Sequence, residues 1–217
     1  VATAVGTTVS TGTVASDDVT TATASTSNAS TTTPTVTDTS YADENIQITI
    51  STLRVDDTDV YVADVQVSSV AYLKTALAQD TFGRNIKQAT SDMAEAHDAI
   101  LAINGDYYGF RDDGFVVRNG VLYRDTVSSG TDALVVGEDG TLSAIGEDAA
   151  SAASLACAGY WQVLSFGPVL VDDGQLAVDE NDEVDKSMTS NPRTAIGMVN
   201  PLHYVLVVSD GRTSESE

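Results

Sequence analysis

The chain of 217 residues is strongly acidic, with ten lysines and arginines, 32 aspartates and glutamates, and a formal net charge of −22. This charge argues against nucleic acid and an anionic membrane surface as partners, because both are bound through basic patches. Membrane insertion is not expected either, because no apolar run reaches the ~18 residues of a spanning helix. The single cysteine, Cys157, excludes a disulfide within the chain and is interpreted as a small buried side chain.

Residues 1–40 are about half threonine and serine and contain no lysine or arginine. Such a composition buries little apolar surface, so we expect a Thr/Ser-rich tail or stalk that packs little. The alternative is an extended strand docked on the domain, because threonine and valine favour β structure. A leader of this kind on an acidic domain is typical of a secreted protein or of a bacterial cell-surface protein. The ordered domain is expected over residues 41–217.

Two segments with alternating apolar and polar residues predict the first strands, 45–51 and 59–69. Two helices are predicted next, over 70–79 and over 90–99, and the second is expected to be capped by Thr90 or Ser91. A buried strand over 99–103 then leads directly into the sequence NGDYYGF.

The second half of the chain contains several hairpin signals. An Asn-Gly or Asp-Gly pair between apolar runs favours a tight turn, and such pairs occur at Asn119-Gly120, Asp139-Gly140 and Asp173-Gly174. A short helix is predicted over 147–159 and a strand over 160–171. The pattern as a whole predicts an α+β fold: a largely antiparallel twisted sheet with several hairpins and a few packed helices, after the Thr/Ser-rich tail.

Several well-known catalytic motifs are absent, among them G-x-S-x-G, H-E-x-x-H, the Walker loop, G-x-G-x-x-G and C-x-x-C. His97 and His203 are interpreted as structural or solvated, so a Ser-His-Asp triad is not expected. Residues 179–185 resemble a calcium loop but lack its central glycine and distal glutamate, which favours a solvated acidic loop. No cofactor and no metal site are predicted.

The last apolar hairpin carries two of the few cations, Arg193 and Arg212, near its ends. A turn over residues 200–203, with Pro201 at its second position, would place Arg193 opposite Asp210. One interpretation is an ordinary cross-strand ion pair with an arginine at the rim. The other is an arginine fork in a partly dry setting, which would bind a phosphate or a carboxylate well.

A second polar group follows the buried strand and consists of Asn104, Gly105, Asp106, Tyr107 and Tyr108. Loops at the ends of buried strands are common places for sites, and Gly105 allows the backbone to bend sharply. Asn104 and Asp106 are suited to orienting a sugar hydroxyl or a water. The alternative is that Asn-Gly only makes a turn and that the tyrosines pack.

Four segments resemble the phosphodiester glycosidase family: AINGDYYGFRDDGFVVRNGVLYR, SFGPVLVDDG, NPRTAIGM and VVSDGRTSESE. The resemblance runs from about Tyr41 to Glu217 in the family's order and leaves the tail outside. The family includes the lysosomal uncovering enzyme, which removes N-acetylglucosamine from mannose-6-phosphate. The resemblance implies hydrolysis of a sugar-1-phosphodiester that releases the sugar and a phosphomonoester.

The resemblance also places the site on the two polar groups, which are expected to meet in one pocket. Asp106 or Asp210 is predicted to activate water, as carboxylates do in glycosidases. A phosphorylated glycan is the expected substrate, bound by Arg193, Arg212, Asn104, Gly105, Tyr107, Tyr108, Thr194 and Gly211. A phosphomonoester is a good leaving group, with a second pKa of about 6, so binding the anion matters more than a strong general acid.

Two other interpretations remain open, a non-catalytic glycan-binding cell-wall module and a hydrolase of another phosphorylated polymer, such as a teichoic acid or capsule linkage. In the family the Asp-Gly-Arg segment leads into a helix and a strand with an Asn-Leu-Asp-Gly-Gly-Gly-Ser type motif, and this sequence contains neither. The resemblance therefore implies a chain that ends before part of the family's site. A second chain or copy is expected to complete the sheet.

Overall fold

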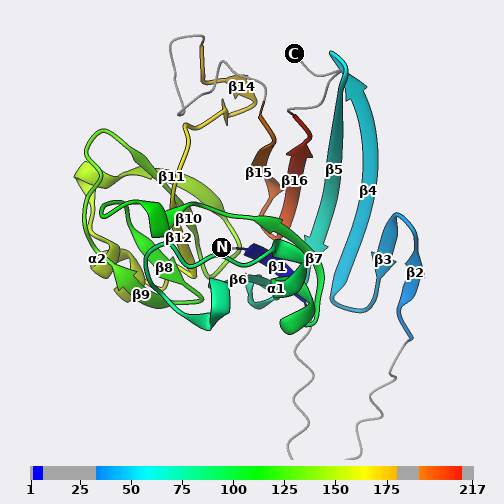
Figure 1. Ribbon diagram of the computed structural model, residues 1–217, viewed down its shortest axis with the longest axis horizontal. Helices are drawn as coiled ribbons and strands as arrows, with labels where there is room; N and C mark the ends of the chain where they lie inside the picture. Colours follow the sequence, from blue (N-terminus) through cyan, green and yellow to red (C-terminus); the bar gives the residue numbers. More distant parts are fainter. Residues whose placement is uncertain (1, 7–32, 180–190, 212–217) are drawn as a thin grey trace, which may run out of the picture.

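A computed structural model describes residues 2–6, 33–179 and 191–211, and these residues are mostly β-strands (Figure 1). The strands form four sheets, in which all the pairings are antiparallel. The described helices are short: α1 (Thr90–Ala96), α2 (Ala152–Cys157) and the 3₁₀ turns Val70–Tyr72, Ala78–Asp80, Tyr108–Phe110 and Glu147–Ala149. The expected α+β fold is confirmed, and no described helix is long and apolar enough to cross a membrane.

The largest sheet has six strands in the order β15-β16-β5-β4-β3-β2. They are β2 (Thr35–Thr37), β3 (Ser40–Ala42), β4 (Ile46–Val55), β5 (Thr58–Val67), β15 (Arg193–Asn200) and β16 (His203–Ser209). Side chains alternate between the two faces of a strand, so the core face of this sheet carries Ile46, Val65 and Leu206, all fully or almost fully buried. The two strands predicted at 45–51 and 59–69 are confirmed.

A three-stranded sheet has the order β6-β1-β7, with β1 (Ala2–Gly6), β6 (Leu73–Ala76) and β7 (Ala99–Asn104). The backbone of β1 pairs with β6 on one side and with β7 on the other. The expectation that residues 1–40 pack little is therefore wrong for β1, where the alternative of a docked strand is right. Strand β2 pairs with β3, but all three of its residues are exposed, which agrees with little packing. The division of the chain at residue 40 stays a prediction.

The five-stranded sheet has the order β11-β10-β12-β8-β9. Its strands are β8 (Val116–Arg118), β9 (Val121–Arg124), β10 (Asp132–Val136), β11 (Leu142–Gly146) and β12 (Gln162–Ser165). Asn119 and Gly120 close the β8–β9 hairpin with φ of 50° and 76°, as the two-residue turn predicts. Asp173-Gly174 likewise joins β13 (Val171–Asp172) to β14 (Gln175–Leu176), whereas the β10–β11 loop around Gly140 is longer than two residues.

Three helix predictions need correction. Residues 70–79 form a 3₁₀ turn followed by β6, because alternation buries Leu73, Thr75 and Leu77 while the backbone pairs with β1. Helix α1 is confirmed, but its N-cap is Ala89, which makes no side-chain capping bond. Helix α2 is shorter than predicted and is capped by Ser151, whose hydroxyl accepts a hydrogen bond from the Ser154 N–H.

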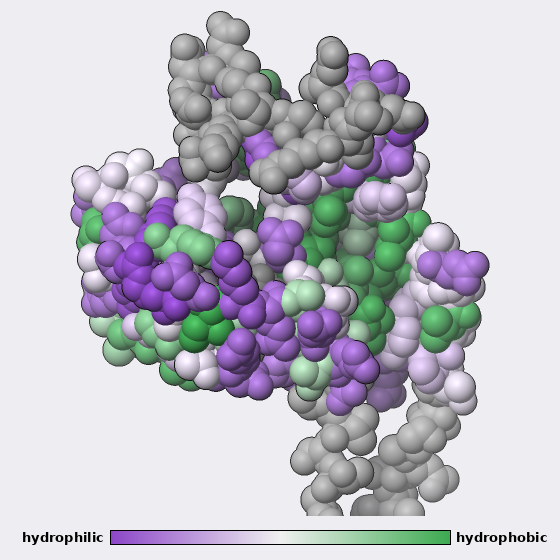
Figure 2. Space-filling view, viewed as in Figure 1, coloured by the Kyte–Doolittle hydropathy of each residue, from purple (hydrophilic) through white to green (hydrophobic). Residues whose placement is uncertain are grey.

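The core has two main parts. The first lies where the six- and three-stranded sheets meet, and it joins Ile46, Leu73 and Tyr204 to the partly buried Ile103. The second lies under α2 and contains residues of the five-stranded sheet, among them Phe115 and Val163. Apolar residues also gather on the surface over β16 and β5, above α1 and β7 (Figure 2).

The interpretation of Cys157 as buried is wrong. The buried residues of α2 are Ala152 and Leu155, and a residue two positions after Leu155 lies on the opposite side of a helix, so Cys157 is exposed. His97 lies 3.0 Å from an Asp80 carboxylate oxygen, and His203 lies 2.9 Å from one of Asp64. Both contacts agree with the interpretation of the histidines as structural or solvated residues.

Candidate active site where three sheets meet

The last residue of β7 contacts the start of β15. The Asn104 side-chain amide donates a hydrogen bond to the Thr194 hydroxyl at 3.1 Å. The two residues are 90 positions apart in the sequence, and each belongs to a different one of the segments that carry the family resemblance. The fold therefore brings Asn104 and Thr194, one residue from each predicted polar group, together at this point.

Asn104, Gly105 and Thr194 line one pocket between the sheets. About 470 Å³ of empty space lies in and in front of the pocket, open solvent included, and about 30 Å³ of it can hold the centre of a water molecule; its other walls come from β6, β10 and β12. Most of the lining is apolar, and polar groups at its base come from Thr75 and Gln162. Because binding pockets combine apolar walls with a few placed polar groups, this pocket is the candidate site.

The base of the pocket is held by a network of hydrogen bonds. Gln162 is buried, and its Oε1 accepts hydrogen bonds from the Thr75 hydroxyl at 2.8 Å and from the Asn119 N–H at 2.9 Å. The Asn119 side chain in turn donates to the Thr75 carbonyl at 2.8 Å and accepts from the Thr75 N–H at 3.0 Å. The tight β8–β9 turn is therefore fixed against β6, which makes the wall of the pocket rigid.

The closing hairpin has nearly the predicted register. Asn200 pairs with His203, as expected from the turn. An irregularity between Met198 and Asn200 then shifts the pairing of all earlier β15 residues by one position. Arg193 is consequently opposite Ser209 instead of Asp210. The predicted neighbourhood of Arg193 and Asp210 at one end of the hairpin is retained, because Asp210 directly follows Ser209.

Two of the family-like segments also pack tightly against each other at this end of the sheet. A Cβ atom built on Gly211 would lie 2.4 Å from the carbonyl carbon of Asn191 and 2.7 Å from the nitrogen of Pro192. Only glycine therefore fits beside the segment that leads into Arg193. Arg212, the second predicted phosphate ligand, lies outside the described residues, as do positions 180–185 of the acidic loop.

Asp210 is fixed against the start of β5. Its Oδ1 accepts a hydrogen bond from the Asp59 N–H at 2.9 Å, and its own N–H donates to the Asp59 carbonyl at 3.0 Å. These bonds orient a half-buried carboxylate at the same end of the sheet as Thr194.

On β15, Thr194 and Ile196 point toward the pocket and the core, so the Arg193 side chain leaves the strand on the other face. Arg193 is exposed at the first position of β15, and its role as a phosphate ligand stays a prediction.

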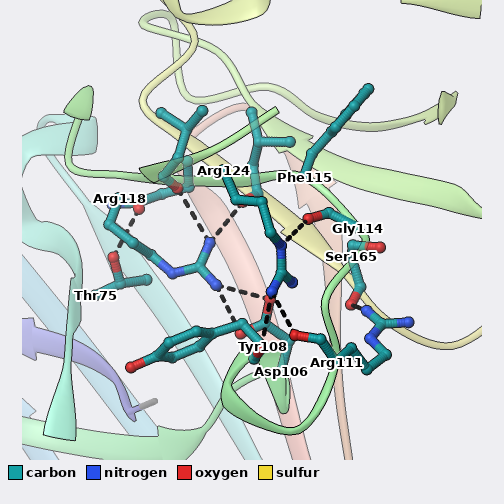
Figure 3. Close-up of polar contacts among 12 residues, drawn as sticks. Thr75, Asp106, Tyr108, Arg111, Gly114, Phe115, Arg118, Arg124 and Ser165 are labelled. Atoms are coloured by element: carbon teal, nitrogen blue, oxygen red, sulfur yellow. Dashed lines mark hydrogen bonds and ion pairs between the residues drawn. The ribbon is translucent and has the colours of Figure 1, made fainter. Parts of the chain in front are cut away.

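Asp106 has a different environment from the one expected of a water-activating base. Both of its carboxylate oxygens accept hydrogen bonds from Arg118 Nη2, at 2.6 and 2.7 Å (Figure 3). The Asp106 side chain is 0% exposed and that of Arg118 is 2% exposed. Asp106 and Asp210 are the two predicted bases. A buried carboxylate held by a guanidinium at both oxygens fits an anchor better than a base, so Asp106 is the weaker candidate.

Three arginines pin the loop after β7 to the five-stranded sheet. Arg118 also donates to the Val163 carbonyl at 2.5 Å. Arg124 donates to the carbonyls of Gly114 at 2.6 Å and Tyr108 at 2.9 Å, and Arg111 donates to the Ser165 carbonyl (Figure 3). Burial lowers the pKa of Arg124, and the charge of neighbouring Arg111 lowers it further. The arginines therefore set the path of the chain that leaves Asn104.

The two tyrosines of this loop differ in environment. Tyr108 is buried, and its ring stacks on Phe82 with 5.2 Å between the centroids. Burial raises the pKa of Tyr108. The charge of Arg118 lowers this pKa by a smaller amount, and the charge of Asp106 raises it. Tyr107 is 44% exposed. Of the two, Tyr107 is the one accessible to a ligand.

Sequence reasoning missed the arginine cluster and Gln162. Arg118 carried a signal, since a charged residue next to the apolar pair Val116 and Val117 must find a partner when it is buried. The partner itself could not be chosen from the sequence. In the described ranges no group of three or more His, Cys, Asp or Glu side chains is placed to hold a metal ion.

Comparison with known proteins identifies the family. Residues 97–217, more than half of the chain, match the phosphodiester glycosidase family model. The chain therefore belongs to the phosphodiester glycosidase family.

Two proteins illustrate this relationship. The uncharacterized SPbeta prophage-derived protein YomE of Bacillus subtilis (strain 168) is 29% identical over 142 residues, which are 62% of this chain. The matched part is 22% of YomE, so this chain spans about a fifth of that protein.

A solved structure has the same fold. It is the catalytic domain of zebrafish N-acetylglucosamine-1-phosphodiester alpha-N-acetylglucosaminidase, auto-inhibited by pro-peptide, and it matches with a TM-score of 0.53 and 18% identity. The match covers 79% of this chain and 62% of the zebrafish chain. At this level of identity the match supports a shared fold.

Proposed function

We propose that the protein hydrolyses a sugar-1-phosphodiester by cleaving the glycosidic bond, so that a free sugar and a phosphomonoester are released. The observation that carries the proposal is the hydrogen bond from Asn104 to Thr194, which joins two family-like segments at the wall of one pocket. Membership of the phosphodiester glycosidase family supports the reaction class.

In this proposal the pocket binds the sugar and the cations bind the phosphate. The Asn104 and Thr194 side chains are suited to sugar hydroxyls, and the apolar walls are suited to the C–H faces of the ring. Arg212, together with Arg193 reaching past the end of β15 from the face away from Thr194, would bind the phosphate, because a guanidinium matches its oxygens in pairs. The same contacts would stabilise the negative charge that develops on the leaving phosphate.

Asp210 is the better candidate for the group that activates water. It is half-buried, its carboxylate is oriented by the Asp59 N–H, and it lies next to the residue that pairs with Arg193. In the proposed step, water attacks the anomeric carbon and gives a proton to Asp210. The C–O bond to phosphate breaks, and the phosphate leaves with the bonding electron pair. Asp106 then serves to anchor the loop that carries Asn104 and Gly105.

A non-catalytic glycan-binding module remains the second candidate, because a pocket with sugar-binding side chains serves recognition equally well. Either function agrees with the proposed location, outside the cell or on a bacterial cell surface, to which the Thr/Ser-rich first 40 residues point. The two functions differ in whether the bound ester is hydrolysed, so a measurement of turnover distinguishes them.

The test is incubation of the full-length protein with defined sugar-1-phosphodiesters, followed by measurement of the reducing sugar released. We expect release by the wild type, a large loss in Arg193→Lys, which keeps the charge but not the paired contacts, and a larger loss in Arg193→Ala. Binding of the same esters without any release would support the binding module instead.

A further inference from the structure

Two exposed aromatic rings follow the pocket residues along one loop, and each ring has a cation beside it. Tyr107 is 44% exposed, and Arg111 Cζ lies 4.7 Å from its ring centroid. Phe110 is 54% exposed, and Lys87 Nζ lies 5.5 Å from its ring centroid. We call these four residues the aromatic–cation strip. Each pair offers an aromatic surface for the C–H face of a sugar and a positive charge for a phosphate.

The strip follows the pocket residues along the chain. Tyr107 comes two residues after Gly105, which lines the pocket. Arg111 donates to the Ser165 carbonyl, directly before Phe166, which also lines the pocket. Both members of the first pair are thus tied to pocket walls, whereas Phe110 and Lys87 extend the strip along the surface.

The strip is held in place by contacts between two loops. The Asn85 N–H donates to the Gly109 carbonyl at 3.1 Å, and Arg84 forms an ion pair with Asp112. Under the strip, Phe82 packs between Tyr108 and Tyr123, with 5.2 Å from its ring centroid to each of theirs. A ligand would therefore meet a preorganised surface, which lowers the entropy cost of binding.

The charge of this region differs from that of the whole chain. Five of the ten cations lie in the two loops and the strands that hold them: Arg84, Lys87, Arg111, Arg118 and Arg124. The carboxylates paired with or adjoining them are Asp106, Asp112, Asp113 and Asp125, so five positive and four negative charges leave +1 in a chain of −22. Arg118 is buried against Asp106, so the positive charge available to a ligand comes from Lys87 and Arg111, and these two cations favour an anionic ligand at short range.

We propose that the aromatic–cation strip binds further units of the ligand, so that the substrate is a polymer of sugars joined by phosphodiester links. This inference rests on the proposed function for the unit that occupies the pocket. The first pair, which is tied to the pocket walls, would hold the phosphorylated sugar next to the pocket, and the second pair would hold the one after it. Two successive aromatic–cation pairs match a ligand in which a ring and a phosphate alternate.

The test compares ligands of one, two and four sugar units with non-hydrolysable phosphonate links, so that binding is measured without turnover. Calorimetry on the full-length wild type should show affinity rising about tenfold or more from one unit to four, since aromatic and charge contacts are added. The variant Lys87→Ala with Phe110→Ala should lose most of this gain. The matched control, Leu53→Ala with Arg54→Ala, alters an exposed apolar residue and an exposed cation on β4 and should keep it.

Three results would overturn the inference. The first is an affinity that does not rise with ligand length in the wild type, and the second is the same rise in the Lys87→Ala, Phe110→Ala variant. The third is equally tight binding of a single-stranded oligonucleotide of the same charge. The proposed function fails separately, if sugar-1-phosphodiesters are not turned over. A gain with length that depends on the strip would then still identify a glycan-binding surface.

Discussion

Asp106 and Arg118 form a pair that links the loop after β7 to β8, with both carboxylate oxygens bound at 2.6 and 2.7 Å and neither side chain more than 2% exposed. A buried charge is costly unless it is paired, so the two residues depend on each other. Asp106 lies two residues after Asn104 in the chain. The pair therefore anchors the loop that carries the pocket residues Asn104 and Gly105.

We expect Asp106→Ala to reduce the free energy of unfolding by about 3–5 kcal/mol, because it leaves the Arg118 charge buried without its partner. The double variant Asp106→Leu, Arg118→Met should recover much of this loss, since both charges are removed. Urea unfolding measures both effects. A variant Asp106→Asn that keeps wild-type stability but has no activity would instead assign a catalytic role to Asp106.

The hydrogen bond between Asn104 and Thr194 should matter for activity. Thr194→Val keeps the shape of the side chain but removes the hydroxyl, and we expect kcat/KM to fall roughly tenfold, which corresponds to about 1.4 kcal/mol. Thr194→Ser should retain most of the activity, because it keeps the hydroxyl. Thr49→Val, at an exposed position on β4, is the control and should have no effect. Equal activity of Thr194→Val and the wild type would show that this hydrogen bond has no role in the reaction.

Gly211→Ala should disturb the site because the new Cβ would lie 2.4 Å from the Asn191 carbonyl carbon. The backbone must move to relieve this overlap, at a cost of about 1–3 kcal/mol, and the segment that leads into Arg193 moves with it. Gly197→Ala is the matched control, since nothing lies within 4 Å of the Cβ position in the same strand region. Thermal unfolding and the sugar-release assay should both separate the two variants, and identical behaviour would contradict the packing argument.

Removal of residues 1–6 should destabilise the domain. Strand β1 lies between β6 and β7, so its loss leaves both neighbours without ladder hydrogen bonds, each worth about 0.5–1.5 kcal/mol. The amides of residues 3–5 should also exchange slowly with solvent in the intact protein. If the shortened protein had the same free energy of unfolding as the intact protein, residues 1–6 would again be interpreted as part of a tail.

The fold could be predicted where local patterns decide it. Alternation identified β4 and β5, and the Asn119-Gly120 turn was readable because positive φ at both positions favours that pair. Residues 70–79 could not be assigned correctly, since a short apolar run fits a helix or a strand until its partner is known. The partner, β1, lies in the segment whose composition indicates a tail.

The site was predictable in its residues but less so in their roles. The polar groups at Asn104 and Thr194 were identified, and their contact follows from the fold. The role of Asp106 depends on Arg118, which is twelve residues away and whose position is set by the five-stranded sheet. The register of Arg193 depends on an irregularity in β15 that no local pattern indicates. Long-range pairing decides such details.

Cleavage at the sugar carbon can be observed by hydrolysing a sugar-1-phosphodiester in water enriched in oxygen-18. Mass spectrometry of the products shows which bond breaks. Cleavage of the glycosidic bond would place the label in the released sugar at its anomeric position and leave the phosphomonoester unlabelled. Label in the phosphate would show attack at phosphorus and rule out glycosidic cleavage, and a complete absence of products would rule out hydrolysis of these esters.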